Sequence, residues 1–182
     1  LLAVTVTAVF VSACWPCPTC PPGPTRVVID FEHYPGPDGK LATSDDVAPP
    51  TSYITTPRNQ WASVGVVFTR GSILRDPQGF GTRAGFGAYY LSSLPVEGTF
   101  SIPVFGIEVT SYSMWNAKLT AYDGSNRVLA VANLWAPGGA FYRGTLRVCT
   151  SEPIAKFAVI EQSENAQAIL NLDYLVLTTS PP

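Results

Sequence analysis

Residues 26–46 carry the side chains whose types and spacing suggest metal chemistry. Hydrophobic residues alternate with Asp30 and Glu32, and a loop rich in Gly and Pro follows. Calcium ions prefer carboxylate and carbonyl oxygens. The loop is not an EF-hand, since Lys40 and Ala42 occupy ligand positions, and two ordinary turns explain its composition equally well. Both readings stay open for the three loop carboxylates, which are Asp38, Asp45 and Asp46.

Catalytic motifs are missing from the sequence. His33 is the only histidine, and no nucleophile elbow, zinc motif or phosphate-binding loop is present. A glycosidase needs only two carboxylates, but surface carboxylates are the ordinary finding in a small domain. We therefore predict a protein that is not an enzyme and keep a small glycoside hydrolase as the third hypothesis. Its candidate carboxylates are Glu97, Glu108, Glu152, Glu161 and Glu164.

Aromatic residues in predicted loops favour a binding function. Sugar sites place exposed rings against pyranose faces and polar side chains at the rim. The loop that begins at Trp135 contains three aromatic residues, and loops carry function more often than core strands do. The same rings could instead cover the edge of a sandwich, whereas Trp61 is expected in the core. The predicted ligand-binding residues are Trp135, Phe141, Tyr142, Arg143, Trp115 and Asn116.

The chain starts with an apolar, uncharged segment, residues 1–13. It is too short to span a membrane and matches the end of a secretory signal peptide. Residues 11–14, Val-Ser-Ala-Cys, resemble the lipobox of bacterial lipoproteins, which implies cleavage before Cys14 and lipid on its thiol. The segment also contains alternating β-branched residues. If residues 1–13 stay in the mature protein, this N-terminal arm could instead complete the sheet of a neighbouring subunit.

Three of the four cysteines lie close together in a Pro-rich stretch, residues 14–25. A zinc or iron–sulfur site would need a fourth nearby ligand, so we expect a semi-rigid tether. In an oxidising compartment, a disulfide is expected among Cys17, Cys20 and Cys149, with the pairing open. These features predict a secreted, cell-envelope or extracellular protein that reaches a membrane only through a lipid anchor.

Composition predicts one all-β domain over residues 26–180. Charged residues make up 13% of the chain and the net charge is −2, which excludes a nucleic-acid partner and a disordered chain. Short runs of β-branched and aromatic residues between turn signals predict about ten antiparallel strands in a jelly-roll sandwich. Residues 27–32 should bury Val27, Ile29 and Phe31, and residues 118–135 should form a hairpin. Pro103 and Gly106 should mark a bend.

Two segments resemble jelly-roll carbohydrate-binding modules with the galactose-binding-like fold. Residues 171–177, Asn-Leu-Asp-Tyr-Leu-Val-Leu, resemble the last strand of that family, and residues 29–32, Ile-Asp-Phe-Glu, resemble the first. The resemblance implies that these strands pair and that a structural Ca²⁺ binds where they meet, at Glu32 and Asp173.

These features together predict a non-catalytic cell-surface binding module whose partner is a glycan or an envelope polymer. The alternative is a structural or adhesive subunit that self-assembles into a surface fibre by strand exchange through the N-terminal arm.

Overall fold

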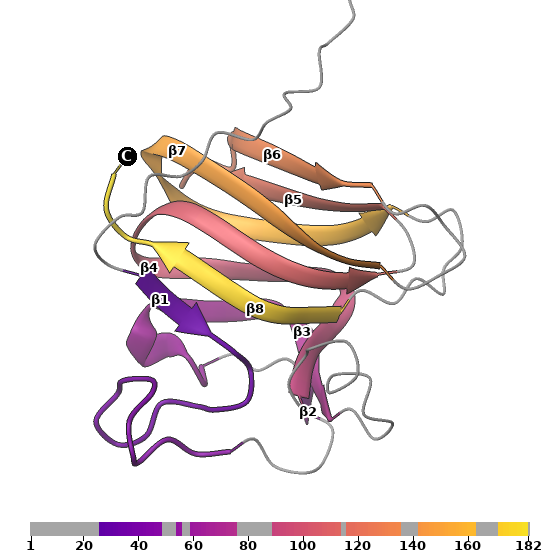
Figure 1. Ribbon diagram of the computed structural model, residues 1–182. Helices are drawn as coiled ribbons and strands as arrows, with labels where there is room; N and C mark the ends of the chain where they lie inside the picture. Colours follow the sequence, from indigo (N-terminus) through magenta and orange to yellow (C-terminus); the bar gives the residue numbers. More distant parts are fainter. Residues whose placement is uncertain are drawn as a thin grey trace, which may run out of the picture.

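A computed structural model describes residues 26–48, 54–55, 59–75, 89–113, 116–135, 142–162 and 171–181. This part of the chain is all-β, as predicted, and its strands form an antiparallel sandwich (Figure 1). A single 3₁₀ turn, η1 (Ala62–Val64), precedes β3. The strands are β1 (Arg26–Ile29), β2 (Ile54–Thr55), β3 (Val66–Arg75), β4 (Tyr89–Ser113), β5 (Asn116–Tyr122), β6 (Val128–Leu134), β7 (Tyr142–Gln162) and β8 (Asn171–Thr178).

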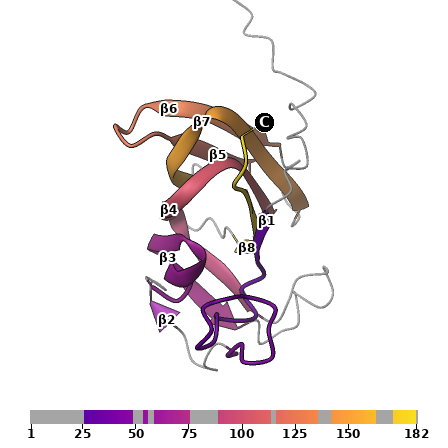
Figure 2. The same cartoon turned by 90° about the vertical axis from the view of Figure 1, so that its left-hand side faces the viewer.

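Two long strands, β4 and β7, take part in both layers of the sandwich. The first part of β4 pairs with β3 and with the second part of β7, which also pairs with β5. The second part of β4 lies between β8 and the first part of β7, and β1 completes that layer. Figure 2 shows β6 at one margin of the molecule and β2 at the other.

The register of β4 breaks where the sequence predicts a bend. Its pairing with β7 shifts between Thr99 and Val104, an interval that contains Pro103, and again between Val104 and Gly106. Extra residues of this kind bend a strand and increase its twist. The described residues form eight strands, and β4 and β7 each continue through such a bend as one strand where the sequence suggested two segments.

The pairing of β1 with β8 confirms the predicted contact between the first and last strands. Ile29 lies opposite Leu175, and Val27 lies opposite Leu177. Ile29 and Phe31 are fully buried, whereas Val28 is 47% exposed, as the alternation predicts. The strand ends earlier than expected, at Ile29, because the backbone turns at Phe31.

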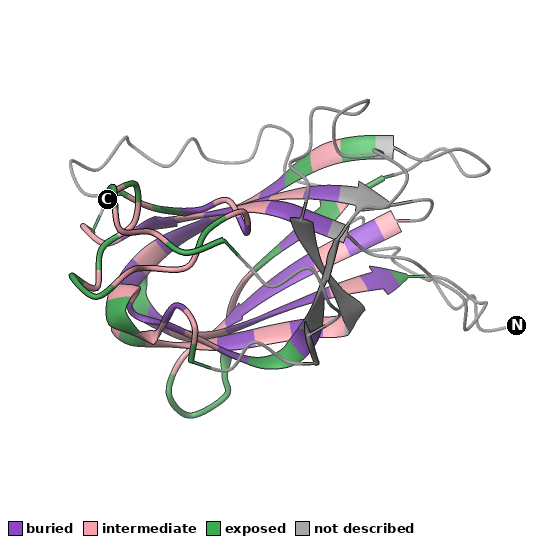
Figure 3. Cartoon of the chain, turned by 90° about the horizontal axis from the view of Figure 1, so that it is seen from below, coloured by how far each residue is buried: buried purple, intermediate pink, exposed green. Residues whose placement is uncertain are grey.

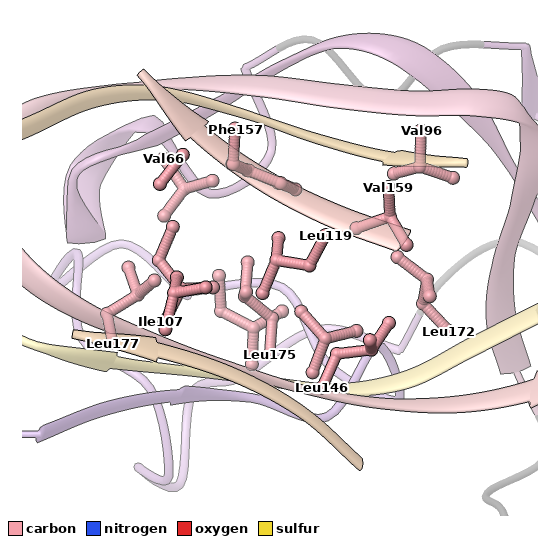
Figure 4. Packing of buried hydrophobic residues seen from close by; sticks show 14 of the residues in the cluster. Val66, Val96, Ile107, Leu119, Leu146, Phe157, Val159, Leu172, Leu175 and Leu177 are labelled. Carbon is pink, nitrogen blue, oxygen red and sulfur yellow. The ribbon is translucent and has the colours of Figure 1, made fainter. Parts of the chain in front are cut away.

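Hydrophobic side chains from both layers fill the space between them (Figure 4). The buried residues of the strands are purple in Figure 3. Trp61 is fully buried, as predicted, and its ring packs against those of Phe31 and Phe68 in T-shaped, edge-to-face contacts at 5.4 and 5.5 Å between centroids. Phe157 continues this cluster toward Phe100, with stacked rings 5.4 Å apart. Full burial of each such ring contributes about 1.5–3 kcal/mol to folding.

The hairpin between β5 and β6 also matches its prediction. Oδ1 of Asp123 accepts hydrogen bonds from the backbone N–H groups of Ser125 and Arg127, both at 2.9 Å. The Ser125 hydroxyl and the Arg127 guanidinium also donate to this carboxylate, and they hold the pKa of Asp123 below its usual value. Asn126 adopts a left-handed conformation, with φ of 65°, that Asn tolerates better than most residues. The turn thus holds β6 on the outer side of β5.

Gly98→Ala tests the close contact between β4 and the aromatic cluster. A Cβ at Gly98 would lie 2.6 Å from Cε1 of Phe157 and 3.2 Å from the carbonyl oxygen of Val67. We expect a loss of about 1–3 kcal/mol of unfolding free energy, measured as a lower Tm. Gly124→Ala is the matched control, because nothing lies within 4 Å of the place that its new methyl group would occupy. Equal melting temperatures for the two variants would contradict this packing.

Candidate functional site at the Trp135 end of the sandwich

One end of the sandwich collects most of the described residues that the sequence predicts for ligand binding. Here β4 and β6 finish, while β5, β7 and β8 begin. Strand register brings these termini together, because Ser113 lies opposite Tyr142, Asn116 opposite Gln162 and Ala117 opposite Leu134. We call this region the Trp135 end.

Trp135 is the most exposed large hydrophobic residue of the described chain, with 78% of its surface accessible. It follows directly on Leu134, which packs so closely against β7 that a Cβ at Gly144 would lie 2.5 Å from its Cδ1. Arg143 precedes Gly144, and its side chain is 45% exposed. The contact between Leu134 and Gly144 therefore keeps the ring and the guanidinium at the same end of the molecule.

The structure describes only some of the predicted ligand-binding set. Asn116 begins β5 and is half-buried. Trp115 and Phe141 lie outside the described residues, and Tyr142 is described only as the first residue of β7.

Buried polar side chains lie behind this surface. Ser111 and Asp173 are fully buried, and Glu161 is 8% exposed. Ser111 lies opposite Gly144 and Leu172 in one layer, and Glu161 lies opposite Ala117 in the other. The sequence suggested Glu161 only as one of five carboxylates and gave no indication of Ser111, since a serine in an alternating strand carries no signal of burial.

Asp173 owes its position to an irregularity in β8. Tyr174 pairs with Thr110 and Leu172 pairs with Ser111, which leaves Asp173 as an extra residue between them. Its Oδ2 lies 3.9 Å from a guanidinium nitrogen of Arg143. A buried carboxylate needs such a neighbouring positive charge to offset the loss of hydration.

A strained turn after β1 brings acidic residues toward the same region. Phe31 is buried with φ of 61°, a costly conformation for a bulky residue. The turn is stabilised because the backbone N–H of Glu32 donates to Oδ1 of Asp30 at 3.0 Å. Nε1 of Trp61 also donates to the carbonyl of His33 at 3.0 Å, and His33 Nδ1 lies 3.5 Å from Oδ2 of Asp30. Hydrogen bonding and aromatic packing together thus hold the strained turn.

The pKa of the Tyr174 phenol responds to the charges of this region. Burial raises the pKa of its phenol, and the carboxylates of Asp173, Asp30 and Glu32 raise it further, while the charge of Arg143 lowers it. Glu32 and Asp173, which the resemblance implied as calcium ligands, therefore lie near enough to act on the same phenol.

The loop after β1 uses its carboxylates as hydrogen-bond acceptors. Oδ2 of Asp45 accepts from the backbone N–H of Asp38 at 3.1 Å, and Oδ2 of Asp46 accepts from the N–H of Ala42 at 2.7 Å. Thr43 donates its hydroxyl to Oδ1 of Asp45 at 2.6 Å, which lowers the pKa of that carboxyl. A side chain at Gly36 would overlap the carbonyl of Asp45. The predicted Pro-Asp-Gly turn is present, because the N–H of Gly39 donates to the carbonyl of Gly36 at 2.9 Å, while Asp45 and Asp46 accept from residues earlier in the loop.

Neither predicted calcium site is complete within the described residues, which contain no group of three His, Cys, Asp or Glu side chains arranged around an ion. Calcium at either place would need further oxygen ligands from the backbone, from water or from the parts of the chain outside the described ranges.

Two of the glutamates suggested for glycoside hydrolysis form ion pairs instead. Glu108 contacts Arg147 and lies 3.7 Å from Arg26, and Glu152 contacts Arg127. Glu164 lies outside the described residues.

Cys149 is disulfide-bonded. Cys14, Cys17 and Cys20 lie outside the described residues, so the pairing and the lipid anchor stay predictions. Among the described residues, no helix has the length and apolar character needed to cross a membrane.

Comparisons with known proteins add only weak structural likenesses. No protein-family model matches the chain, and no curated protein matches it significantly. A variant of a family 29 carbohydrate-binding module is 12% identical, with a TM-score of 0.40 over 86% of this chain and 93% of its own. A family 43 arabinoxylan arabinofuranohydrolase from Bacillus subtilis, solved with cellotetraose, is 14% identical, with a TM-score of 0.40 over 81% of this chain.

The adhesin domain of Lys-gingipain from Porphyromonas gingivalis is also similar, with 16% identity and a TM-score of 0.35 over 50% of this chain and 75% of its own. For the arabinofuranohydrolase described above, the region similar to this chain spans only 33% of that protein's own length. At these identities and TM-scores, the similarities assign no function to the Trp135 end.

Tyr174→Phe tests the grouping of charges beside β8. A raised folded-state pKa means that the folded protein holds the phenolic proton more tightly than the unfolded chain does. The stabilisation from this proton is therefore fully present below the pKa of the phenol in the unfolded chain, about 10, and is lost as the pH rises through its pKa in the folded protein. We expect the variant to lose less stability than wild type in denaturant titrations above about pH 10. Tyr122→Phe, in the other layer, serves as control, and identical alkaline profiles for wild type and Tyr174→Phe would contradict the grouping.

Proposed function

We propose that the protein is a non-catalytic binding module that takes a glycan or an envelope polymer at the Trp135 end. The observation that carries the proposal is the 78% exposure of Trp135 beside polar side chains. Exposure of so large a ring leaves a face open for stacking against a sugar ring. The neighbouring Arg143 and Asn116 supply hydrogen-bond donors at the rim.

The arrangement favours binding over hydrolysis. Among the described residues of this end, the exposed side chains of Trp135, Arg143 and Gln162 carry no carboxylate, whereas Asp173 and Glu161 are buried. A glycosidase acid and base must both reach the scissile bond. A small glycoside hydrolase therefore ranks below a binding module, and a fibre subunit that exchanges strands through residues 1–13 remains the alternative.

The proposal places this module outside the cell. Residues 1–13 and Cys14 would direct export and lipid attachment, and the Pro-rich tether would hold the domain away from the membrane. A disulfide at Cys149 suits an oxidising compartment.

A structural calcium ion is the second part of the proposal. It is supported by the resemblance of the first and last strands and by the buried carboxylate of Asp173 near the turn that carries Glu32. The ion would stabilise this junction and would take no part in chemistry.

Trp135→Ala tests the binding site directly. We expect wild type to bind members of a glycan array or purified cell-wall polymers, and we expect the variant to lose about 5- to 150-fold in affinity, since one stacked ring contributes roughly 1–3 kcal/mol. Val47→Ala, at a residue 53% exposed in the loop after β1, is the matched control and should bind like wild type. Binding that Trp135→Ala leaves intact would contradict the site.

Thermal melts test the calcium ion. If an ion binds the folded protein, Tm is higher in excess Ca²⁺ than in chelator. At a Ca²⁺ concentration one hundred times Kd, the free energy of unfolding rises by about 2.7 kcal/mol. Asp173→Asn should remove that difference if the ion lies at the junction, whereas Asp45→Asn should remove it if the ion lies in the loop. Equal Tm values for wild type in calcium and in chelator would exclude the ion.

A further inference from the structure

Strand β6 forms an edge of the sheet. In the described part of the chain it pairs only with β5, and it lies at the margin of the molecule in both side views (Figures 1 and 2). The N–H and C=O groups along such an outer edge are a template for another strand. The outer edge of β6 can therefore accept a further strand.

The sequence of β6 lacks the usual protection of an edge strand. Its seven residues, Val-Leu-Ala-Val-Ala-Asn-Leu, include no charge and no proline. Val128 is 51% exposed and Val131 is 48% exposed. Edge strands normally avoid pairing through charged side chains, proline or short length.

The margins formed by β1 and β2 are better protected, and the first part of β7, which among the described strands pairs only with β4, carries Arg143 and Arg147. Strand β2 has two residues, and β1 has four, beginning with Arg26 and followed by Asp30. Glu108 lies 3.7 Å from Arg26 and places a second charge beside β1. Among these described edges, only β6 combines seven uncharged residues with two exposed valines.

A second copy of the same strand fits this edge. Antiparallel pairing of two identical strands is symmetric, so the residue at the centre meets its own counterpart. Centring the pair on Val131 places Val131 of one copy beside Val131 of the other, at roughly 4.5–5.5 Å between their Cβ atoms. Because β6 has no charge, this pairing brings no like charges together within the strand.

We propose that two copies of the protein associate through antiparallel pairing of their β6 strands, with Val131 at the centre. The two sheets then continue into one another across a two-fold axis. Pairing of one strand from each copy is at the small end of protein interfaces, so the expected dissociation constant is roughly micromolar or weaker. The interface depends on the backbone of β6 and on Val131, and this register sets Trp135 opposite Arg127 of the other copy, so the interface adjoins the Trp135 end without using its ring.

Sedimentation equilibrium of the full chain, from low micromolar to millimolar concentration, tests the proposal. We expect reversible dimerisation of wild type and at least tenfold weaker self-association of both Val131→Lys and Val131→Glu. A 1:1 mixture of these two variants should recover dimers, because opposite charges then meet at the centre. Val28→Lys, at a valine 47% exposed on β1, is the matched control and should dimerise like wild type. Circular dichroism melts identify any variant that fails to fold.

Several results would overturn the proposal. Wild type that stays monomeric at all concentrations would exclude it. Dimers that persist in Val131→Lys, or that disappear when residues 1–13 are removed, would assign assembly to another surface or to the N-terminal arm. Failure of the mixed charged variants to associate, when both are folded, would exclude the symmetric pairing at Val131.

Discussion

The structure depends on the sharing of β4 and β7 between the two layers. Each strand bends once and contributes one part to either sheet, so the layers are joined by covalent chain as well as by side-chain packing. Gly98 lies opposite Phe157 just before the bend in β4, where only a residue without a side chain fits. The aromatic cluster therefore packs at the place where the backbone changes layer.

The same connectivity determines where a site can form. Because β4 and β7 cross between layers, the termini of five strands meet at the Trp135 end. One side of this end is exposed, at Trp135 and Arg143, and the other holds Ser111, Glu161 and Asp173 in buried positions. A rigid arrangement of strands thus supports polar groups close to an exposed ring, which is the arrangement that a binding module requires.

Alternation of residue types explains why much of the fold could be predicted. Val27, Ile29 and Phe31 occupy alternate positions, and pairing of β1 with β8 turns them toward the core, where Ile29 and Phe31 are fully buried and Val27 is partly buried. The left-handed turn at Phe31 was not predictable, because a large aromatic residue gives no local signal for positive φ. The continuity of β4 and β7 was also missed, since proline and glycine at a bend look like the ends of separate strands.

The candidate site could be predicted only in part. Trp135 was recognisable because an aromatic residue after a strand and before Pro and Gly is expected at the surface. The ion pair of Arg143 with Asp173 joins residues thirty positions apart and depends on an extra residue in β8. Such a contact follows from register, which the sequence did not specify.

The most direct measurement is an NMR titration of the protein with soluble oligosaccharides, following the indole N–H signals. Trp61 is a built-in reference, because its indole is buried and donates to the carbonyl of His33. We expect the Trp135 signal to shift with saturable dependence on sugar concentration while the Trp61 signal stays unchanged. Sugar binding that leaves the Trp135 signal unmoved would contradict the account.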